Sequence, residues 1–177
     1  MMKIIIFVML FALSLNSYAV KPKIIELKDY PCKVDKEAKK KYGHLKGHAG
    51  CIIIEKGKLL VTHDIANKNK IGIPGGTAGK DESSMCTAGR ETYEETGVHV
   101  KVHELLHNFH DRFYVFRCEL QDKKMADLKS LPVPEQFQHE ISKAYWLNVD
   151  NSKRDRWRFP NQFLLVRGIV QYYNSKK

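Results

Sequence analysis

Beyond its first residues, the chain has no apolar run long enough to cross a bilayer, so it is not a protein with several membrane spans. It also lacks internal repeats, and its only low-complexity stretch is a lysine-rich one. Acidic residues are scarce, because 20 Asp and Glu stand against 30 Lys and Arg and leave a formal net charge of +10. This surplus favours anionic partners such as polyphosphates, nucleic acids or anionic lipids, and charge alone does not choose among them.

The one apolar run lies at the start of the chain and is typical of an export signal. Lys3 precedes apolar residues 4–15, and Ser17-Tyr18-Ala19 offers the small residues that a signal peptidase requires. An uncleaved membrane anchor is the competing interpretation, but the run is shorter than the roughly 20 residues a spanning helix needs. We expect residues 1–19 to be removed, leaving an exported, periplasmic or secreted protein without a membrane anchor.

Cysteine is sparse, with four residues in the whole chain: Cys32, Cys51, Cys86 and Cys118. In an oxidising compartment they can form up to two disulfides, and three pairings are possible. Buried free cysteines are an equally good interpretation, because Cys51, Cys86 and Cys118 lie in apolar surroundings.

The pattern along the chain predicts one mixed α/β domain over residues 49–177, after a basic lead-in at residues 20–48 with at most one short strand or helix. Gly57 divides two β-rich runs and indicates a hairpin. A glycine- and proline-rich loop follows at residues 71–79, and then a helix from Ser84 to Thr96 that Gly97 ends. Further strands are expected at residues 98–105, 113–120 and 144–147, and a last helix at 163–173. This order favours a mixed central sheet covered by helices on both faces.

Three carboxylates share one face of the predicted helix. Glu91, Glu94 and Glu95 stand at i, i+3 and i+4, so they fall within an arc of roughly 100°. Like charges at this spacing repel unless cations neutralise them. Hard divalent ions with oxygen ligands, above all Mg²⁺, suit such a cluster together with substrate phosphates. The neighbouring Arg90 can hold one of the carboxylates in position. On the opposite side, Gly89 suggests close contact between helix and sheet.

The stretch from Gly76 to Val98 resembles the Nudix box. Gly76, five residues, Glu82, seven residues and then Arg90-Glu91-Thr92-Tyr93-Glu94-Glu95-Thr96-Gly97 match all seven fixed positions of that motif. Thr92 departs from it, because the family usually has an aliphatic residue there. The similarity extends over about residues 50–150 and implies a Nudix-type α/β/α sandwich.

The resemblance also implies roles for particular residues. Glu91, Glu94 and Glu95 bind metal, Gly75 offers its backbone carbonyl, and Glu82 supports the site together with Arg90. Glu91 is the expected general base. Glu140, before a predicted strand, is a candidate further ligand or base, and Tyr114 stands near a tyrosine that dinucleoside polyphosphate hydrolases of the family tend to carry.

The implied activity is Mg²⁺-dependent hydrolysis of a diphosphate bridge, with Mn²⁺ as a possible substitute. The expected partner is a nucleotide or another diphosphate-containing small molecule, with no stable nucleic-acid partner; the substrate's leaving group and the oligomeric state stay open. The alternative is a non-catalytic Nudix-like scaffold that binds RNA or another polyanion. Every catalytic position of the box is filled, which favours the enzyme.

Other candidate sites are weaker. His103, His107 and His110 have a spacing that suits a zinc site on a helix, but the residues around them indicate strand and loop. Phe137, Tyr145 and Trp157 can stack on a base, although core packing is the usual role of such residues.

Overall fold

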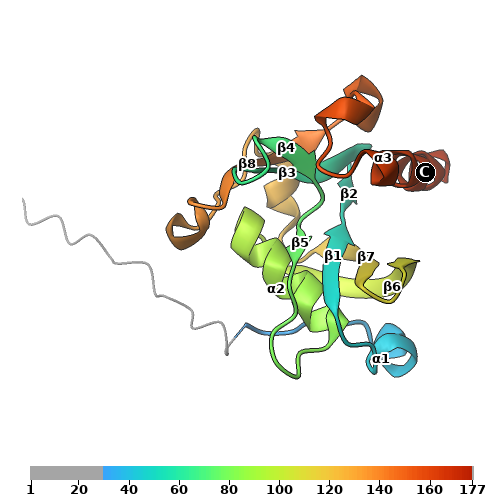
Figure 1. Ribbon diagram of the computed structural model, residues 1–177. Coiled ribbons are helices and arrows are strands. Elements are labelled where there is room, and N and C mark those ends of the chain that lie inside the picture. Colours follow the sequence, from blue (N-terminus) through green and yellow to red (C-terminus); the bar gives the residue numbers. More distant parts are fainter. Residues whose placement is uncertain (1–29, 177) are drawn as a thin grey trace, which may run out of the picture.

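A computed structural model describes residues 30–176, so the predicted signal at residues 1–19 lies outside the described part. Within that part the chain forms two four-stranded sheets with helices on either side (Figure 1). No helix of the described residues is long and apolar enough to span a bilayer. The lead-in contributes one short helix, α1 (Lys36–Tyr42), whose N-terminus is capped by the Asp35 side chain.

The first sheet is mixed and has the strand order β5-β1-β7-β6. Strand β1 (His48–Ile52) runs parallel to β7 (Phe113–Leu120) and antiparallel to β5 (Gly75–Gly76). Strand β6 (Val100–Phe109) pairs antiparallel with β7. The parallel pairing joins segments more than sixty residues apart, and the antiparallel pairing with β5 places the start of β1 beside the glycine turn.

The second sheet is built around β3 (Lys58–Asp64). Strand β8 (Ile141–Leu147) pairs with it antiparallel, as do the two short strands β2 (Ile54–Glu55) and β4 (Lys70–Gly72). The turn between β2 and β3 holds Lys56 and Gly57, both at positive φ, as a two-residue hairpin loop requires. The predicted hairpin around Gly57 is therefore present, with β2 and β3 as its two strands.

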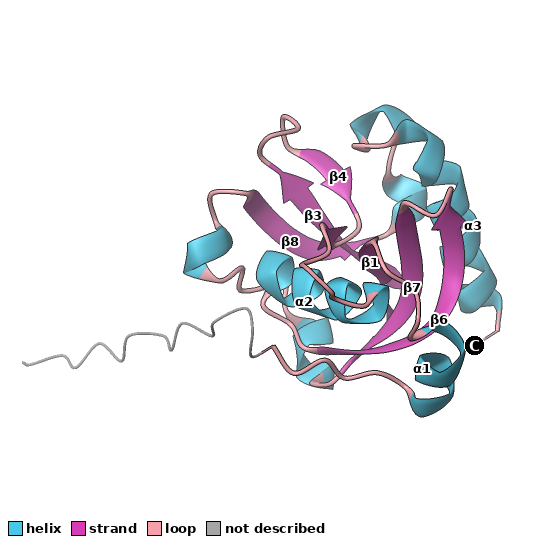
Figure 2. Ribbon diagram, turned by 60° about the horizontal axis from the view of Figure 1, so that its bottom comes forward, coloured by secondary structure: helices cyan, strands magenta, loops and turns pink. Residues whose placement is uncertain are grey.

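Two helices cover the strands from opposite sides (Figure 2). Helix α2 (Ser84–Thr96) packs with alternate residues of β1 and β7, such as Cys51 and Phe116, in one apolar cluster. Helix α3 (Pro160–Ser175) packs with the intervening residues, including Ile52 and Val115, in a second. Period-two alternation along the strands thus supplies both cores, and the expected mixed sheet covered on both faces is confirmed.

Two expectations need correction. The glycine-rich segment 71–79 was predicted to be irregular, yet β4 and β5 lie within or overlap it, because β3 and β1 supply pairing partners that local sequence does not reveal. A side chain at Gly89 would meet Tyr30 and Val102 at 3.4 and 3.5 Å, which is ordinary contact. The close approach between helix and sheet therefore does not require glycine at this position.

Candidate active site

Helix α2 has the boundaries that its sequence predicts. The Ser83 hydroxyl accepts a hydrogen bond from the Cys86 N–H at 3.3 Å, and Gly97 ends the helix in the left-handed conformation at φ 71°. Thr92, the departure from the usual motif, is fully buried, and its hydroxyl donates to the Ala88 carbonyl at 2.7 Å. This bond satisfies the hydroxyl inside the core, so threonine is accommodated at an otherwise aliphatic position.

Arg90 joins the carboxylates of the helix to the loop before it. Its Nε and Nη2 both donate to the Glu82 carboxylate at 3.0 Å, and Nη2 also donates to the Thr77 carbonyl at 2.7 Å. Its Nη1 lies 2.9 Å from Glu94 and 3.0 Å from Glu91. A bidentate guanidinium with this many partners fixes the orientation of every group it contacts.

Glu82 is not one of the predicted metal ligands. Although burial acts against it, the hydrogen bonds from Arg90 and from the Gly79 N–H hold its pKa below the ordinary value. The ionised form of Glu82 is therefore favoured, and its carboxylate accepts hydrogen bonds from Arg90 Nε and Nη2.

For the three carboxylates on helix α2, burial disfavours the charged form. Burial raises the pKa of Glu91 to about 7, and the negative charge of Glu94 adds to the effect. Burial likewise raises the pKa of Glu94, with Glu140 contributing, and that of Glu95, which goes well above its ordinary value. Three carboxylates that resist ionisation together form a site that a cation would stabilise.

The glycine turn lies directly against these carboxylates. The Gly75 N–H donates to Glu95 at 3.1 Å, and the Glu91 carboxylate lies so close to Gly76 that a side chain there would meet its oxygen at 2.5 Å. The turn thereby places backbone beside the cluster, as a site that combines carboxylate and carbonyl oxygens requires.

The donor set fits a divalent cation by its chemistry. Among the described residues, no group of three or more His, Cys, Asp or Glu side chains already surrounds a common point. Glu91, Glu94 and Glu95 nevertheless share one helix face beside the Gly75-Gly76 turn, and oxygen ligands of this kind suit hard cations. These residues, with the Gly75 carbonyl, are the ones that would hold such an ion.

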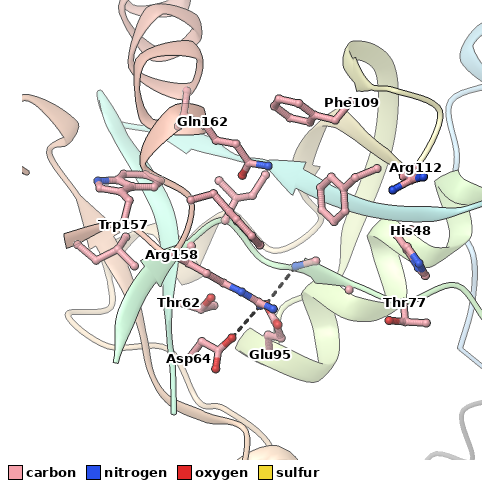
Figure 3. A pocket seen from close by; sticks show the side chains of 18 residues that line it. His48, Thr62, Asp64, Thr77, Glu95, Phe109, Arg112, Trp157, Arg158 and Gln162 are labelled. Atoms are coloured by element: carbon pink, nitrogen blue, oxygen red, sulfur yellow. Dashed lines mark hydrogen bonds and ion pairs between the residues drawn. The ribbon is translucent and has the colours of Figure 1, made fainter. Parts of the chain in front are cut away.

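A cavity of about 350 Å³ opens beside the cluster, between the two sheets and the start of α3. Figure 3 shows Asp64, Arg158 and Glu95 together at one end, with Phe109 and Gln162 at the other. The lining combines acidic, basic and aromatic side chains, including His48, Arg112, Phe113, Trp157 and Phe159. Such a mixture suits a ligand with both a charged and an aromatic part.

Glu140 and Tyr114 lie apart from this cavity. The Glu140 side chain is 65% exposed and lies 3.2 Å from the adjacent His139, although its charge reaches Glu94. Tyr114 is 5% exposed and packs in the core on the α2 side of β7, whereas the preceding residue, Phe113, faces the cavity. The substrate contact predicted for Tyr114 has no support from this position.

The remaining candidates separate clearly. His103 and His107 lie on β6 and His110 in the following turn, so no helix brings them together. Of the three aromatic candidates, Trp157 lines the cavity, whereas Phe137 and Tyr145 do not. Arg158 and Phe159, beside Trp157, were not recognised from the sequence, because no motif marks them.

The NUDIX domain family model matches residues 44–165, more than half of the chain. The chain therefore belongs to the Nudix family of hydrolases, as the stretch from Gly76 to Val98 predicts. No curated protein matches it.

Solved structures show the same fold at low sequence identity. A NUDIX hydrolase from Nitrosomonas europaea is 19% identical with a TM-score of 0.55, and the match covers 72% of this chain and 73% of that one. An ADP-ribose pyrophosphatase from Streptococcus suis is 17% identical with a TM-score of 0.52, and the match covers 71% of this chain and 91% of that one. An Ap4A hydrolase from C. elegans is 16% identical with a TM-score of 0.54, and the match covers 72% of this chain and 98% of that one.

Proposed function

We propose that this protein is a Mg²⁺-dependent pyrophosphohydrolase that cleaves the diphosphate bridge of a nucleoside diphosphate linked to another group. The observation that carries the proposal is the complete arrangement around Arg90, which ties Glu82, Glu91 and Glu94 together beside the cavity. The similar ADP-ribose pyrophosphatase and Ap4A hydrolase folds support the substrate class. Dinucleoside polyphosphates belong to the same class.

The reaction is attack of water on one phosphorus of the bridge. When bound at the cluster, Mg²⁺ would stabilise charge on the phosphate oxygens and help a water to lose its proton. Glu91 is the proposed acceptor of the proton of the attacking water, because its carboxylate lies within the cluster and directly against Gly76 of the glycine turn. The products are a nucleoside monophosphate and a second phosphorylated fragment.

Each residue of the motif has a distinct part in this mechanism. Glu91, Glu94 and Glu95 would hold the cation together with the Gly75 carbonyl, and Arg90 and Glu82 fix the carboxylates. Glu140 lies outside the cluster, but its charge acts on Glu94. It is therefore a second candidate base.

The alternative of a polyanion-binding scaffold requires no intact cluster. A scaffold would tolerate loss of the Arg90 interactions, whereas here four of the carboxylate and carbonyl contacts of that side chain are at 3.0 Å or less. The structure offers no specific observation in favour of the scaffold.

The test is the formation of nucleoside phosphate products, separated by chromatography, from a panel of dinucleoside polyphosphates, ADP-ribose, dinucleotide cofactors, capped RNA and nucleoside triphosphates, with Mg²⁺ or Mn²⁺. Wild type is compared with Glu94→Gln, and Glu135→Gln, an exposed carboxylate outside the site, is the matched control. We expect metal-dependent turnover that Glu94→Gln abolishes and Glu135→Gln keeps. No turnover on any compound, with tight polyanion binding by all three proteins, contradicts the proposal.

We also propose that the protein works outside the cytoplasm. The predicted signal at residues 1–19 supports this, and so do the two disulfides, Cys32–Cys86 and Cys51–Cys118, because such bonds persist in oxidising compartments. The intact mass of protein isolated from its own cells tests it. A mature chain beginning at Val20 supports export, and a chain that keeps residues 1–19 in the cytoplasmic fraction contradicts it.

A further inference from the structure

Two adjacent residues outside the motif, Arg158 and Phe159, line the cavity and have no part in the mechanism above. They lie between the short helix η5 (Arg154–Arg156) and α3. The cavity around them is lined by aromatic and basic side chains and by the carboxylates of Asp64 and Glu95.

The segment that carries Arg158 is firmly attached to the second sheet. The Arg158 N–H donates to the Ile71 carbonyl at 2.8 Å, and Trp157 pairs with Ile71 as a parallel bridge. Trp157 is 3% exposed, and its indole N–H donates to the Ser152 hydroxyl at 2.9 Å. The backbone position of Arg158 is therefore set before any ligand binds, which lowers the entropy cost of binding.

The Arg158 side chain lies beside the metal-binding end of the cavity. Its Nη1 is 2.7 Å from the Asp64 carboxylate, and its charge acts on Glu95 (Figure 3). Within the described residues, Asp64 is the only carboxylate at ion-pair distance, and the side chain is 39% exposed. Further N–H donors of the planar guanidinium are thus available to a phosphate next to Glu95.

Phe159 presents a large apolar surface at the same cavity. It is 49% exposed, and the Arg158 guanidinium lies 5.0 Å from its ring centroid. An exposed ring backed by a cation can stack on a nucleobase, because every base has an apolar face. The group that would contact the phosphate, on Arg158, and the ring that would contact the base, on Phe159, therefore belong to consecutive residues.

The size of the cavity limits what it holds. At about 350 Å³ it lies near the lower end of the roughly 300–1,000 Å³ usual for small-molecule sites. This volume suits one nucleoside with its diphosphate and leaves the second half of a larger substrate outside.

We infer that Arg158 and Phe159 are the specificity-determining residues of this enzyme: Arg158 binds the diphosphate and Phe159 stacks on the base of a single nucleoside held in the cavity. The inference rests on the proposed function. It makes the nucleoside, rather than the diphosphate alone, the part that the protein recognises.

Two non-hydrolysable probes separate these contacts. Affinities for α,β-methylene-ADP and for methylenediphosphonate, which lacks the nucleoside, are measured by calorimetry with Mg²⁺. Phe159→Ala is expected to weaken binding of the nucleotide about tenfold and to leave binding of methylenediphosphonate unchanged. Arg158→Ala is expected to weaken both about tenfold, and Arg158→Lys, which keeps the charge, to weaken both less.

The matched controls are Tyr172→Ala, an aromatic residue 53% exposed on α3, and Arg167→Ala, whose side chain is 43% exposed and forms an ion pair with Asp150; neither lines the cavity. Thermal unfolding of each variant verifies folding. The inference is overturned if Phe159→Ala affects both probes equally or neither, or if Arg158→Ala binds like Arg167→Ala. If the variants give one of these results and wild type still turns over its substrate, only the specificity inference fails. If wild type neither binds the probes nor hydrolyses any compound of the panel, the proposed function fails as well.

Discussion

At the residue scale, Gly76 shows how the motif positions a carboxylate by leaving out a side chain. A Cβ at this position would meet the Glu91 carboxylate carbon at 2.6 Å and one of its oxygens at 2.5 Å. The obstructed group is the end of a flexible side chain, and the φ of Gly76 is not in the left-handed region. Glu91 can therefore move aside without unfolding the protein.

Gly76→Ala is accordingly expected to lower kcat on the order of 100-fold while changing the free energy of unfolding little, because a displacement of about 1 Å suffices for such a loss. Steady-state kinetics and urea unfolding measure the two effects. Gly168→Ala is the control for kcat, since it lies on α3 and no group from another part of the protein lies within 4 Å of the added methyl group. A Gly76→Ala variant with wild-type kcat would show that Glu91 has no exact position to keep.

At the level of the single element, helix α2 and its C-terminal cap contain two glycines, Gly89 and Gly97, which we expect to respond oppositely to replacement by alanine. At Gly89 an added methyl group makes ordinary contacts, whereas at Gly97 the φ is 71° and the methyl would lie 2.2 Å from the Pro132 carbonyl oxygen. Gly89→Ala is expected to stabilise the protein by up to about 1 kcal/mol, the usual difference inside a helix. Gly97→Ala is expected to destabilise it by about 1 kcal/mol or more.

Urea unfolding of both variants checks this pair of predictions. Destabilisation by Gly89→Ala would mean that helix and sheet lie closer together than the contacts to Tyr30 and Val102 indicate. A neutral Gly97→Ala would argue against the left-handed end of α2.

The same helix shows how far sequence alone reaches. Caps, spacing and the terminal glycine are local signals, so the bounds Ser84 and Thr96 were predictable, as was the shared face of the carboxylates. Strands β4 and β5 were not, because their pairing depends on β3 and β1. The cavity residues Arg158 and Phe159 were also missed, since only the pairing of Trp157 with Ile71 brings their segment to the site.

At the scale of the whole molecule, the two disulfides connect parts that are distant in sequence. Cys32–Cys86 ties the lead-in to α2, and Cys51–Cys118 joins β1 to β7, with Cα separations of 5.1 and 5.6 Å. We expect no reactive thiol in the denatured, non-reduced protein and four after reduction, measured by thiol titration. Two or more free thiols in protein from an oxidising compartment would contradict the pairing.

The carboxylate cluster should also link stability to pH and metal. Burial raises the pKa of Glu91 from 4.5 to about 7, so in metal-free protein its contribution to stability is present below pH 4.5 and lost as pH rises through 7. Mg²⁺ favours the ionised form and should stabilise the protein more at pH 8 than at pH 5. At a concentration tenfold above Kd the gain is about 1.4 kcal/mol.

Thermal unfolding with and without Mg²⁺ at the two pH values measures this linkage, and Glu94→Gln is the comparison. Equal shifts at both pH values, or an undiminished shift in Glu94→Gln, would place the bound metal elsewhere.

Attack of water on a phosphorus of a diphosphate bridge can be followed at this site by product analysis in ¹⁸O-labelled water. The substrate that the panel identifies is turned over with Mg²⁺, and the products are weighed by mass spectrometry. We predict one ¹⁸O atom, carried by only one of the two phosphorylated products, and no labelled product from Glu94→Gln. Products without ¹⁸O, or labelled products that form equally with Glu94→Gln, would contradict the account.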